Sequence, residues 1–325
     1  MKIGLTYDLR SEYLKMGFSE EETAEFDQEG TIIAIESTLN DLNYQTERIG
    51  HIKQLVSRLN NGDRWDLVFN ICEGMYGNGR EAQVPALLDA YKIPYVFSSP
   101  LVLALTLDKA LTKRVIRDAG LATPEFFIVN NPQDIEKIKL PFPLFAKPMA
   151  EGTGKGINGK SVINTKAELK EKCLSLLTEY NQAVLVETFM SGREFTTGIV
   201  GTGSEARAVG TMEIILNEYA EKNVYSYTNK EECDDLVEYK AATGKEKKVC
   251  EELALASYRL LGCEDGGRVD IRMDENGIPN FLEINPLAGI HPVHSDLPIL
   301  STLNGVSYIQ LMEMIMNSAI KKIRV

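Results

Sequence analysis

The first hundred residues show two hydrophobic periods. Residues 2–7 place an apolar side chain at every second position, which predicts a short strand. Between residues 32 and 42 the apolar side chains recur at helical spacing, which predicts a helix with one buried face. The next elements are expected to be a buried strand at 66–72, a helix at 81–91 and a strand at 93–97. This alternation predicts a small parallel sheet flanked by helices over about residues 1–105.

Helix-boundary signals and short strands mark the rest of the chain. Ser99-Pro100 is a favourable helix start, and Asp108 can cap a second helix that Gly120 ends. A capping box of Thr165 and Glu168 begins a helix that runs to about residue 180. Strands are expected at 126–129, 142–147, 161–164, 183–188 and 194–200, and more follow from residue 206, with helices at 245–261 and from residue 306.

These elements predict a mixed α/β chain of three domains. An N-terminal domain with the parallel sheet is expected at 1–107, a central domain at 108–195 and a C-terminal domain at 196–325. The stretch 217–245 is polar and irregular, with an acidic cluster at 231–235. A solvated loop and a mobile active-site loop are both compatible with it.

The segment 268–285 predicts a hairpin, because Asn276-Gly277 is the favoured two-residue turn. That turn places Asp270 opposite Glu283, and Arg268 opposite Asn285. These four polar side chains then share one face, while Val269, Ile271, Leu282 and Ile284 share a core face.

Two opposed carboxylates destabilise a sheet unless a cation lies between them. Oxygen ligands such as those of Asp270, Glu283 and Asn285 suit Mg²⁺, which binds few protein carboxylates. Arg268 beside them can neutralise phosphoryl or tetrahedral-intermediate charge. A solvent-facing strand of mixed charge explains the same pattern, so hairpin geometry alone leaves both interpretations open.

A glycine-rich loop spans residues 144–161. Its last eight residues match the Walker A pattern, but a Walker loop needs a helix that opens at its Lys-Ser pair. Here Ser161 is followed by apolar residues, and the helix is expected to start only at Thr165. We therefore expect a loop between two antiparallel strands, with glycine N–H groups covering phosphates and Lys147 directed at the same place. A glycine-rich loop without a ligand remains the alternative.

Composition and charge exclude several classes of protein. The formal net charge of -12 argues against a nucleic-acid or anionic-membrane partner. Five dispersed cysteines fit reduced thiols in a cytoplasm better than disulfides. Residues 1–10 lack the apolar segment of a signal peptide, so none is expected, and the sequence has no apolar run long enough to span a membrane. The sequence fixes no oligomeric state, and a homodimer is compatible with it.

Several segments resemble D-alanine–D-alanine ligases of the ATP-grasp superfamily, in the same order along the chain. They are residues 79–124, 142–156 and 184–196, the hairpin, and residues 285–298. The resemblance covers roughly residues 66–310, and the spacing of several motifs makes it more specific than any one of them. It implies an ATP-grasp fold with ATP held between the central and C-terminal domains, and it favours the metal interpretation of the hairpin.

The resemblance also implies roles for individual residues. ATP would contact the lysines Lys109 and Lys147, the loop residues Glu151, Gly152, Thr153, Gly154 and Gly156, the domain-linking strand end Glu187, Thr188, Phe189 and Met190, and the ribose ligand Glu194. Two Mg²⁺ ions, or Mn²⁺, would bind Asp270, Glu283 and Asn285. Arg268, Gly289 and Thr153 would act in catalysis, and Lys230 and Ser295 would hold the carboxylate of the second amino acid.

The chain departs from the family at the first-substrate site. Residues 7–30 replace the family's N-terminal loop, whose Glu binds the first D-alanine, and no clear counterpart of that Glu is present. Glu231 stands where the family has Tyr, Glu73 where it has His, and Thr153 where it has Ser. The reaction class therefore transfers better than the substrate.

The expected reaction joins a carboxylate to an amine through an acyl phosphate, with loops 151–160 and 217–245 closing over the site. Family membership further implies peptidoglycan synthesis and cell-wall biogenesis in the cytoplasm, with small amino acids as substrates. An ATP-binding protein of the same fold with a different or no ligase activity is the alternative, and a P-loop phosphotransferase is a second rival.

Overall fold

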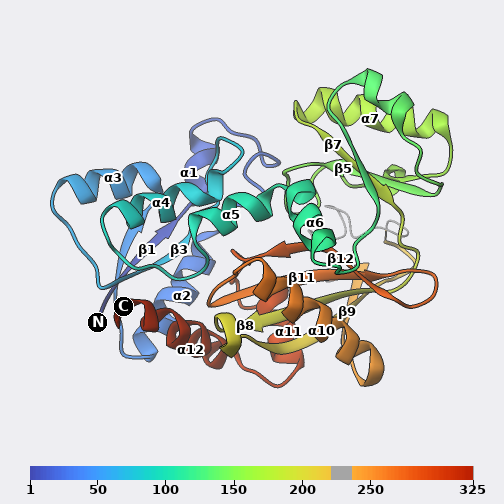
Figure 1. Cartoon of the computed structure of the whole chain (residues 1–325). Coiled ribbons are helices and arrows are strands. Elements are labelled where there is room, and N and C mark those ends of the chain that lie inside the picture. The colour runs from blue at the N-terminus through green and yellow to red at the C-terminus, as the bar shows by residue number, and fades with distance from the viewer. Residues whose placement is uncertain (221–235, 325) are drawn as a thin grey trace.

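Three sheets organise the molecule, as Figure 1 shows. The computed structural model describes residues 1–220 and 236–324. The first sheet is parallel, in the order β2-β1-β3. Its strands are β1 (Lys2–Tyr7), β2 (Gln45–Gly50) and β3 (Leu67–Ile71). The helices around it are α1 (Arg10–Lys15), α2 (Glu29–Asp41), α3 (Ile52–Asn60), α4 (Gln83–Ala90) and α5 (Pro100–Leu107), with the 3-10 turn η1 (Arg80–Ala82) before α4.

The predicted parallel sheet is confirmed, with one correction. Every residue of β3 is buried, as expected for a strand covered by helices on both faces. The strand expected at 93–97 does not form; Tyr95 makes only an isolated bridge to Val68. Strand β2 carries Glu47 and Arg48 in its middle, so its polar sequence gave no hydrophobic signal.

The second sheet is antiparallel, in the order β4-β7-β5-β6, and forms the upper right part of Figure 1. Its elements are β4 (Phe126–Val129), β5 (Leu144–Pro148), β6 (Val162–Ile163), β7 (Val184–Thr188) and α7 (Lys166–Tyr180); α6 (Lys109–Asp118) precedes it, and two 3-10 turns, η2 (Pro132–Lys137) and η3 (Gly159–Ser161), lie in its loops. Asp108 caps α6 and Thr165 caps α7, as predicted.

The third sheet, also antiparallel, has the order β10-β9-β8-β11-β12. Its strands are β8 (Glu194–Val200), β9 (Arg207–Leu216), β10 (Val237–Ala241), β11 (Gly266–Met273) and β12 (Pro279–Asn285), with the 3-10 turn η4 (Gly203–Glu205) between β8 and β9. The helices are α10 (Gly244–Leu260), α11 (Asp296–Leu303) and α12 (Tyr308–Ala319), followed by η5 (Ile320–Arg324).

The first and third sheets share one hydrophobic core. Ile3 and Leu5 of β1 belong to the same buried cluster as Met312 and Ile315 of α12. The two chain ends accordingly lie close together on the left of Figure 1. The second sheet packs with α7 over a core of its own. Each sheet lies mainly in one of the three predicted domains, although β8 begins two residues before the predicted boundary at 196. The domain boundaries stay a prediction.

The glycine-rich loop does not begin a helix. Strands β5 and β6 pair antiparallel on either side of it, and a 3-10 turn followed by β6 stands where a Walker helix would open. The expected strand–loop–strand arrangement is confirmed.

The remaining physical expectations concern thiols and membranes. Cys72, Cys173, Cys250 and Cys263 are buried and unpaired, and Cys233 lies outside the described residues. Across residues 1–220 and 236–324, no helix combines the length and the apolar character that crossing a bilayer requires.

Candidate active site

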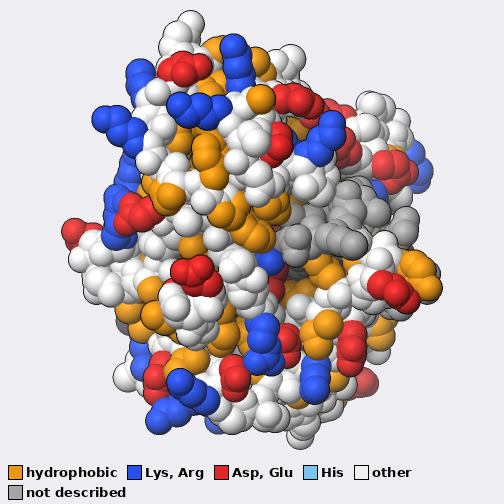
Figure 2. All heavy atoms as spheres, turned by 90° about the vertical axis from the view of Figure 1, so that its right-hand side faces the viewer, with side chains coloured by type: hydrophobic (Ala, Val, Ile, Leu, Met, Phe, Trp, Pro, Cys, Tyr) orange, Lys and Arg blue, Asp and Glu red, His pale blue; other side chains and the backbone are white. Residues whose placement is uncertain are grey.

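Two neighbouring cavities lie where the three sheets meet. The larger has a volume of about 410 Å³ and is lined by the segment before α2, by η1 and by the loop after β12. The smaller is lined by β5, the end of β7 and the β11–β12 hairpin. Lys109, Glu151 and Glu283 line both cavities. On the face shown in Figure 2 the surface is hollowed between its upper and lower halves, with charged side chains at the floor.

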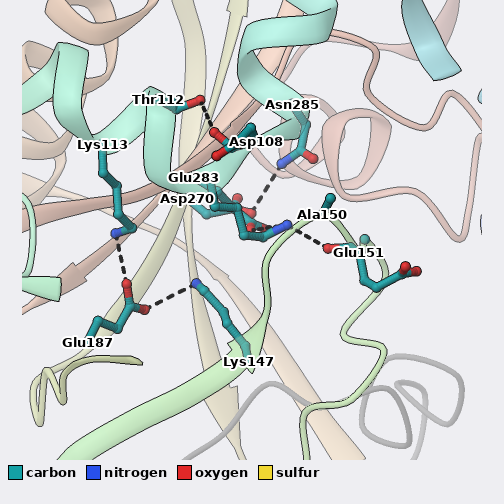
Figure 3. A network of polar contacts seen from close by, with 12 residues as sticks. Asp108, Thr112, Lys113, Lys147, Ala150, Glu151, Glu187, Asp270, Glu283 and Asn285 are labelled. Carbon is teal, nitrogen blue, oxygen red and sulfur yellow. Dashed lines mark hydrogen bonds and ion pairs between the residues drawn. The ribbon is translucent and has the colours of Figure 1, made fainter. Parts of the chain in front are cut away.

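Glu187 lies between two lysines at the smaller cavity. Its Oε1 is 3.1 Å from Lys147 Nζ and its Oε2 is 3.1 Å from Lys113 Nζ, as Figure 3 shows. Burial raises the pKa of Glu187, but the two lysines outweigh burial and hold that pKa below its usual value. Burial lowers the pKa of Lys113 to about 8, so this lysine stays largely protonated at neutral pH. Two cations for one anion leave a positive charge that favours a phosphate group nearby.

Aromatic and apolar side chains form the opposite wall of the smaller cavity. The rings of Phe145 and Phe189 stack with centroids 6.4 Å apart. The Arg272 guanidinium lies 5.0 Å from the Phe189 ring centroid and pairs with Glu194 Oε2 at 3.1 Å. The predicted residues Glu187, Thr188, Phe189, Met190 and Glu194 all line this cavity. A slot of this kind suits a planar heterocycle with hydroxyl groups beside it.

The hairpin register at the site is the predicted one. Arg268 pairs with Asn285, and Asp270 with Glu283. The predicted two-residue turn is wrong, because the strands end at Met273 and Pro279. A bulge beside Asp270 restores the register.

The bulge also changes the role of Leu282. Phe281, and not Leu282, occupies the fully buried core position of β12. Leu282 instead lines the smaller cavity, next to Glu283. Its expected place on the core face with Val269 and Ile284 is therefore wrong, and the sequence gave no signal for the bulge.

The opposed carboxylates are surrounded by cations and one amide. Asp270 accepts hydrogen bonds from Arg268 Nη1, from Thr196 Oγ1 at 2.9 Å and from Asn285 Nδ2 at 3.4 Å. Glu283 Oε2 lies 3.5 Å from Lys109 Nζ. Figure 3 shows Asp270, Glu283 and Asn285 directed toward one another.

This donor set fits a hard divalent cation. It offers two carboxylates and one amide oxygen, which match the few protein ligands that Mg²⁺ takes alongside water and phosphate. In the part of the chain that the structure describes, no group of three or more His, Cys, Asp or Glu side chains clusters as a metal cage. Any ion here would therefore complete its coordination with a ligand such as a phosphate.

The glycine-rich loop is tied to the N-terminal segment by Glu25. Gly152 N donates to Glu25 Oε1 at 2.6 Å, and Arg80 Nη2 donates to Glu25 Oε2 at 2.8 Å. Lys155 Nζ lies 3.4 Å from the same carboxylate. Burial raises the pKa of Glu25, but Arg80 and Lys155 outweigh it and keep the carboxylate ionised. A Cβ on Gly152 would lie 2.7 Å from Glu25 Oε1, so a side chain there would displace this carboxylate.

The other predicted residues of the glycine-rich loop do not all line the same cavity. Lys109 Nζ donates to the carbonyl of Glu151 at 2.5 Å. Thr153 lines the larger cavity and Gly154 the smaller one. Gly156 lines neither of the two; a Cβ there would meet the ring of Pro148, so its role is in the turn.

We expect Glu25→Gln to loosen the glycine-rich loop. The change removes the charge that pairs with Arg80 and also faces Lys155, whose nearer partner is Glu151. Hydrogen bonds to charged groups contribute about 1.5–3 kcal/mol. Cleavage by trypsin after Lys155, mapped by mass spectrometry, should speed up about tenfold. Glu136→Gln is the control, because Glu136 is exposed in η2 and lines neither cavity. Equal cleavage of the two variants would contradict the assignment.

The larger cavity brings together the predicted catalytic residues. Arg268 forms ion pairs with Asp270 and, at 3.5 Å, with Asp296. Gly289 and Ser295 are in contact, since a Cβ on Gly289 would lie 2.7 Å from Ser295 Oγ. Ser295 stands at the start of α11, where its hydroxyl accepts from His291 N at 2.9 Å. A carboxylate bound there would face the helix N-terminus.

Two residues named from the sequence cannot be placed, and several residues at the cavities were not named from the sequence. Lys230 and Glu231 lie outside the described residues, so their predicted roles stay predictions. Glu25 and Arg80, which the structure places at the glycine-rich loop, gave no motif. Further residues of this kind are Asp27, Glu81 and Tyr239, which line the larger cavity, and Leu282, which lines the smaller.

Comparisons with known proteins agree on one family. The family model described as D-ala D-ala ligase C-terminus matches residues 115–317. A D-alanine–D-alanine ligase from Marinomonas sp. is 34% identical over 264 residues, which are 80% of this chain and 79% of the relative. The ATP complex of a D-alanine–D-alanine ligase from Bacillus anthracis superposes with a TM-score of 0.74 at 22% identity, over 100% of this chain and 99% of that one.

A ligase with a different second substrate is equally similar in fold. The VanG D-Ala:D-Ser ligase from Enterococcus faecalis also has a TM-score of 0.74, at 21% identity over 98% of this chain and 99% of that one. The fold therefore does not determine the substrates.

Proposed function

Because the chain belongs to the D-alanine–D-alanine ligase family and is an ATP-dependent ligase that forms C–N bonds, we propose that it binds ATP in the smaller cavity and two amino acids in the larger. The opposed Asp270 and Glu283 carry this proposal. They stand at the junction of the two cavities, with Arg268 and Lys109 beside them. That is where a phosphoryl group must pass from ATP to a carboxylate.

We infer that Asp270, Glu283 and Asn285 would hold magnesium, with manganese as a substitute. The oxygen donor set and the open side of the site support this assignment. When bound, the metal would neutralise charge on the phosphates. The remaining chemistry belongs to side chains and backbone groups of this chain.

The proposed reaction has two steps. Lys109 and Lys147 hold the phosphates while a carboxylate oxygen of the first amino acid forms a bond to the γ-phosphorus and the bond to ADP breaks. The amine of the second amino acid then attacks the acyl carbon, loses a proton and displaces phosphate. Arg268 and the N–H of Gly289 stabilise the oxyanion between these events. Ser295 and the α11 N-terminus hold the carboxylate of the second amino acid.

A substrate screen tests the proposal. Pairs of amino acids of both chiralities are incubated with enzyme, ATP and Mg²⁺, and phosphate release and product mass are measured. The proposal expects release that depends on an amino acid, with a product that has lost one water relative to the pair. ATP binding without such release for any pair would contradict it.

We expect D-alanine not to be the preferred first substrate. Glu73, which lines the larger cavity, replaces the family's histidine and makes that end more acidic than an alanine side chain requires. The value of kcat/KM with D-alanine alone should fall below about 10⁴ M⁻¹s⁻¹, near the lower end of ordinary enzymes. A different pair should exceed it. A value for D-alanine at or above that figure would show that the departures from the family are neutral.

We further propose that the protein acts in the cytoplasm, where ATP is available and buried thiols stay reduced. The four buried, unpaired cysteines support this location. A role in peptidoglycan synthesis depends on the product: a D-alanyl-D-alanine product would support it, and another dipeptide or amide would not.

A further inference from the structure

The larger cavity contains more negative than positive charge. Seven Asp and Glu side chains of the described residues line it, against four Arg and Lys side chains. Four of the seven acids have an ion-pair partner: Glu25 pairs with Arg80, Glu151 with Lys155, Glu283 with Lys109, and Asp296 with Arg268. The four basic side chains are thus already engaged, since Arg10 pairs with Glu20.

Three carboxylates remain without an ion pair among the described residues: Asp27, Glu73 and Glu81. Asp27 accepts a hydrogen bond from Thr31, which is neutral. Burial, followed by the negative charges of Glu81 and Glu25, raises the pKa of Glu73 well above its usual value. Burial likewise raises the pKa values of Asp27 and Glu81. Without a ligand, the surroundings of these three carboxyl groups therefore disfavour their ionised forms.

The fold places these acids at a position where α/β sheets bind ligands. Strand β1 is the middle strand, flanked by β2 on one side and β3 on the other, so the chain order reverses beside it. Glu73 follows the carboxyl end of β3. Asp8, at the carboxyl end of β1, accepts a hydrogen bond from Gly74 N at 2.8 Å and so fixes the backbone that carries Glu73. Crevices at such switch points are the usual ligand sites of open parallel sheets.

A further observation points to a polar ligand at the same end. The Nε of Arg10 is buried and has no acceptor among the described residues, and Arg10 lines the same cavity. A buried N–H without an acceptor is costly. An amino-acid ligand would supply both an acceptor for Arg10 and cations for the three carboxylates.

We propose that the amino acid bound at the N-terminal end of the larger cavity carries a cationic side chain, an ammonium or a guanidinium, in addition to its α-ammonium. This inference rests on the proposed function and specifies its substrate class. One α-ammonium can neutralise one carboxylate and leaves the others unpaired. A second cationic group four to six bonds away can reach the neighbouring acid, so a basic amino acid satisfies the cavity better than a neutral one.

The first test compares substrates that differ only in side-chain charge. Lysine and arginine, as both enantiomers, are each paired with D-alanine and set against norleucine and citrulline, whose neutral side chains have similar shapes. Phosphate release and product mass are measured with the unaltered enzyme. We expect kcat/KM to favour the basic member of at least one matched couple by tenfold or more, as a charge-assisted contact of about 1.5–3 kcal/mol implies.

The second test changes the carboxylates. Glu73→Gln and Glu81→Gln keep the size of the side chain and remove its charge, so each should reduce the preference for the basic substrate about ten- to hundredfold. Glu136→Gln, an exposed acid in η2 away from both cavities, is the matched control and should keep the preference. If one variant fails to fold, the other variant and the substrate comparison still decide.

The outcomes separate this inference from the proposed function. Equal or better turnover of norleucine and citrulline than of their basic counterparts would overturn the inference and leave the ligase assignment intact. A basic preference that survives both carboxylate changes would also overturn it, because the cation would then be bound elsewhere. Absence of phosphate release with every pair, basic or neutral, would contradict the proposed function and the inference with it.

Discussion

Replacement of Glu283 by glutamine is expected to abolish turnover while the protein still folds. Glu283 faces Asp270 across the β11–β12 pair and borders both cavities. The amide keeps the shape of the side chain but loses the charge that a divalent cation and Lys109 require. A loss of several kcal/mol of charge stabilisation lowers kcat by roughly a thousandfold or more. Removal of one of two opposed negative charges does not destabilise the sheet.

Three measurements check this prediction: phosphate release at saturating substrates, the Mg²⁺ concentration that gives half-maximal rate, and the thermal unfolding midpoint. Glu275→Gln is the control, because Glu275 is exposed in the turn of the same hairpin. The control should match the unaltered enzyme in all three. A Glu283→Gln enzyme that turns over normally would remove the metal assignment.

The hairpin shows how far sequence reasoning reached and where it stopped. Opposed charges on Asp270 and Glu283 could be predicted because strand periodicity fixes which residues face each other. The length of the turn could not be predicted. The turn is longer than the expected two residues, but the bulge in β12 compensates for the difference, so the register at Asp270 and Glu283 is the same in both cases. Leu282 was therefore assigned to the core, although it lines the smaller cavity.

Contacts between distant segments could not be predicted at all. The bond from Gly152 to Glu25 joins residues 127 positions apart, and neither residue belongs to a periodic pattern that refers to the other. Glu25 lies among several acids of the segment 7–30, so charge alone does not single it out. Its role depends on the packing of the first domain against the glycine-rich loop, which only the folded chain shows.

The same limit explains the substrate side of the site. The motifs proposed to hold ATP lie on strands and turns with strong local signals, such as Lys147 at the end of β5. The acids Asp27, Glu73 and Glu81 come from three loops or turns of the first domain and meet only in the folded chain. Reaction class could thus be read from local patterns, whereas specificity could not.

Lys147→Ala is expected to reduce ATP turnover far more than Lys160→Ala. The two lysines flank the same glycine-rich loop, and the Walker interpretation would make Lys160 the phosphate ligand. The structure places them differently: Lys147 is buried, lines the smaller cavity and pairs with Glu187, while the Lys160 side chain is 82% exposed and lies 3.5 Å from Glu171. Loss of one charge-assisted phosphate contact should lower kcat/KM for ATP about a hundredfold for Lys147, with little change for Lys160.

The buried ion pair of Lys147 calls for a control on folding. Its removal leaves Glu187 with Lys113 as counterion at 3.1 Å, so the carboxylate does not become an isolated buried charge. Thermal unfolding and the affinity for a non-hydrolysable ATP analogue should be measured for both variants alongside turnover. A folded Lys147→Ala enzyme with weak analogue binding supports the assignment. Greater damage from Lys160→Ala would restore the Walker interpretation, because only that chemistry depends on the lysine at the end of the loop.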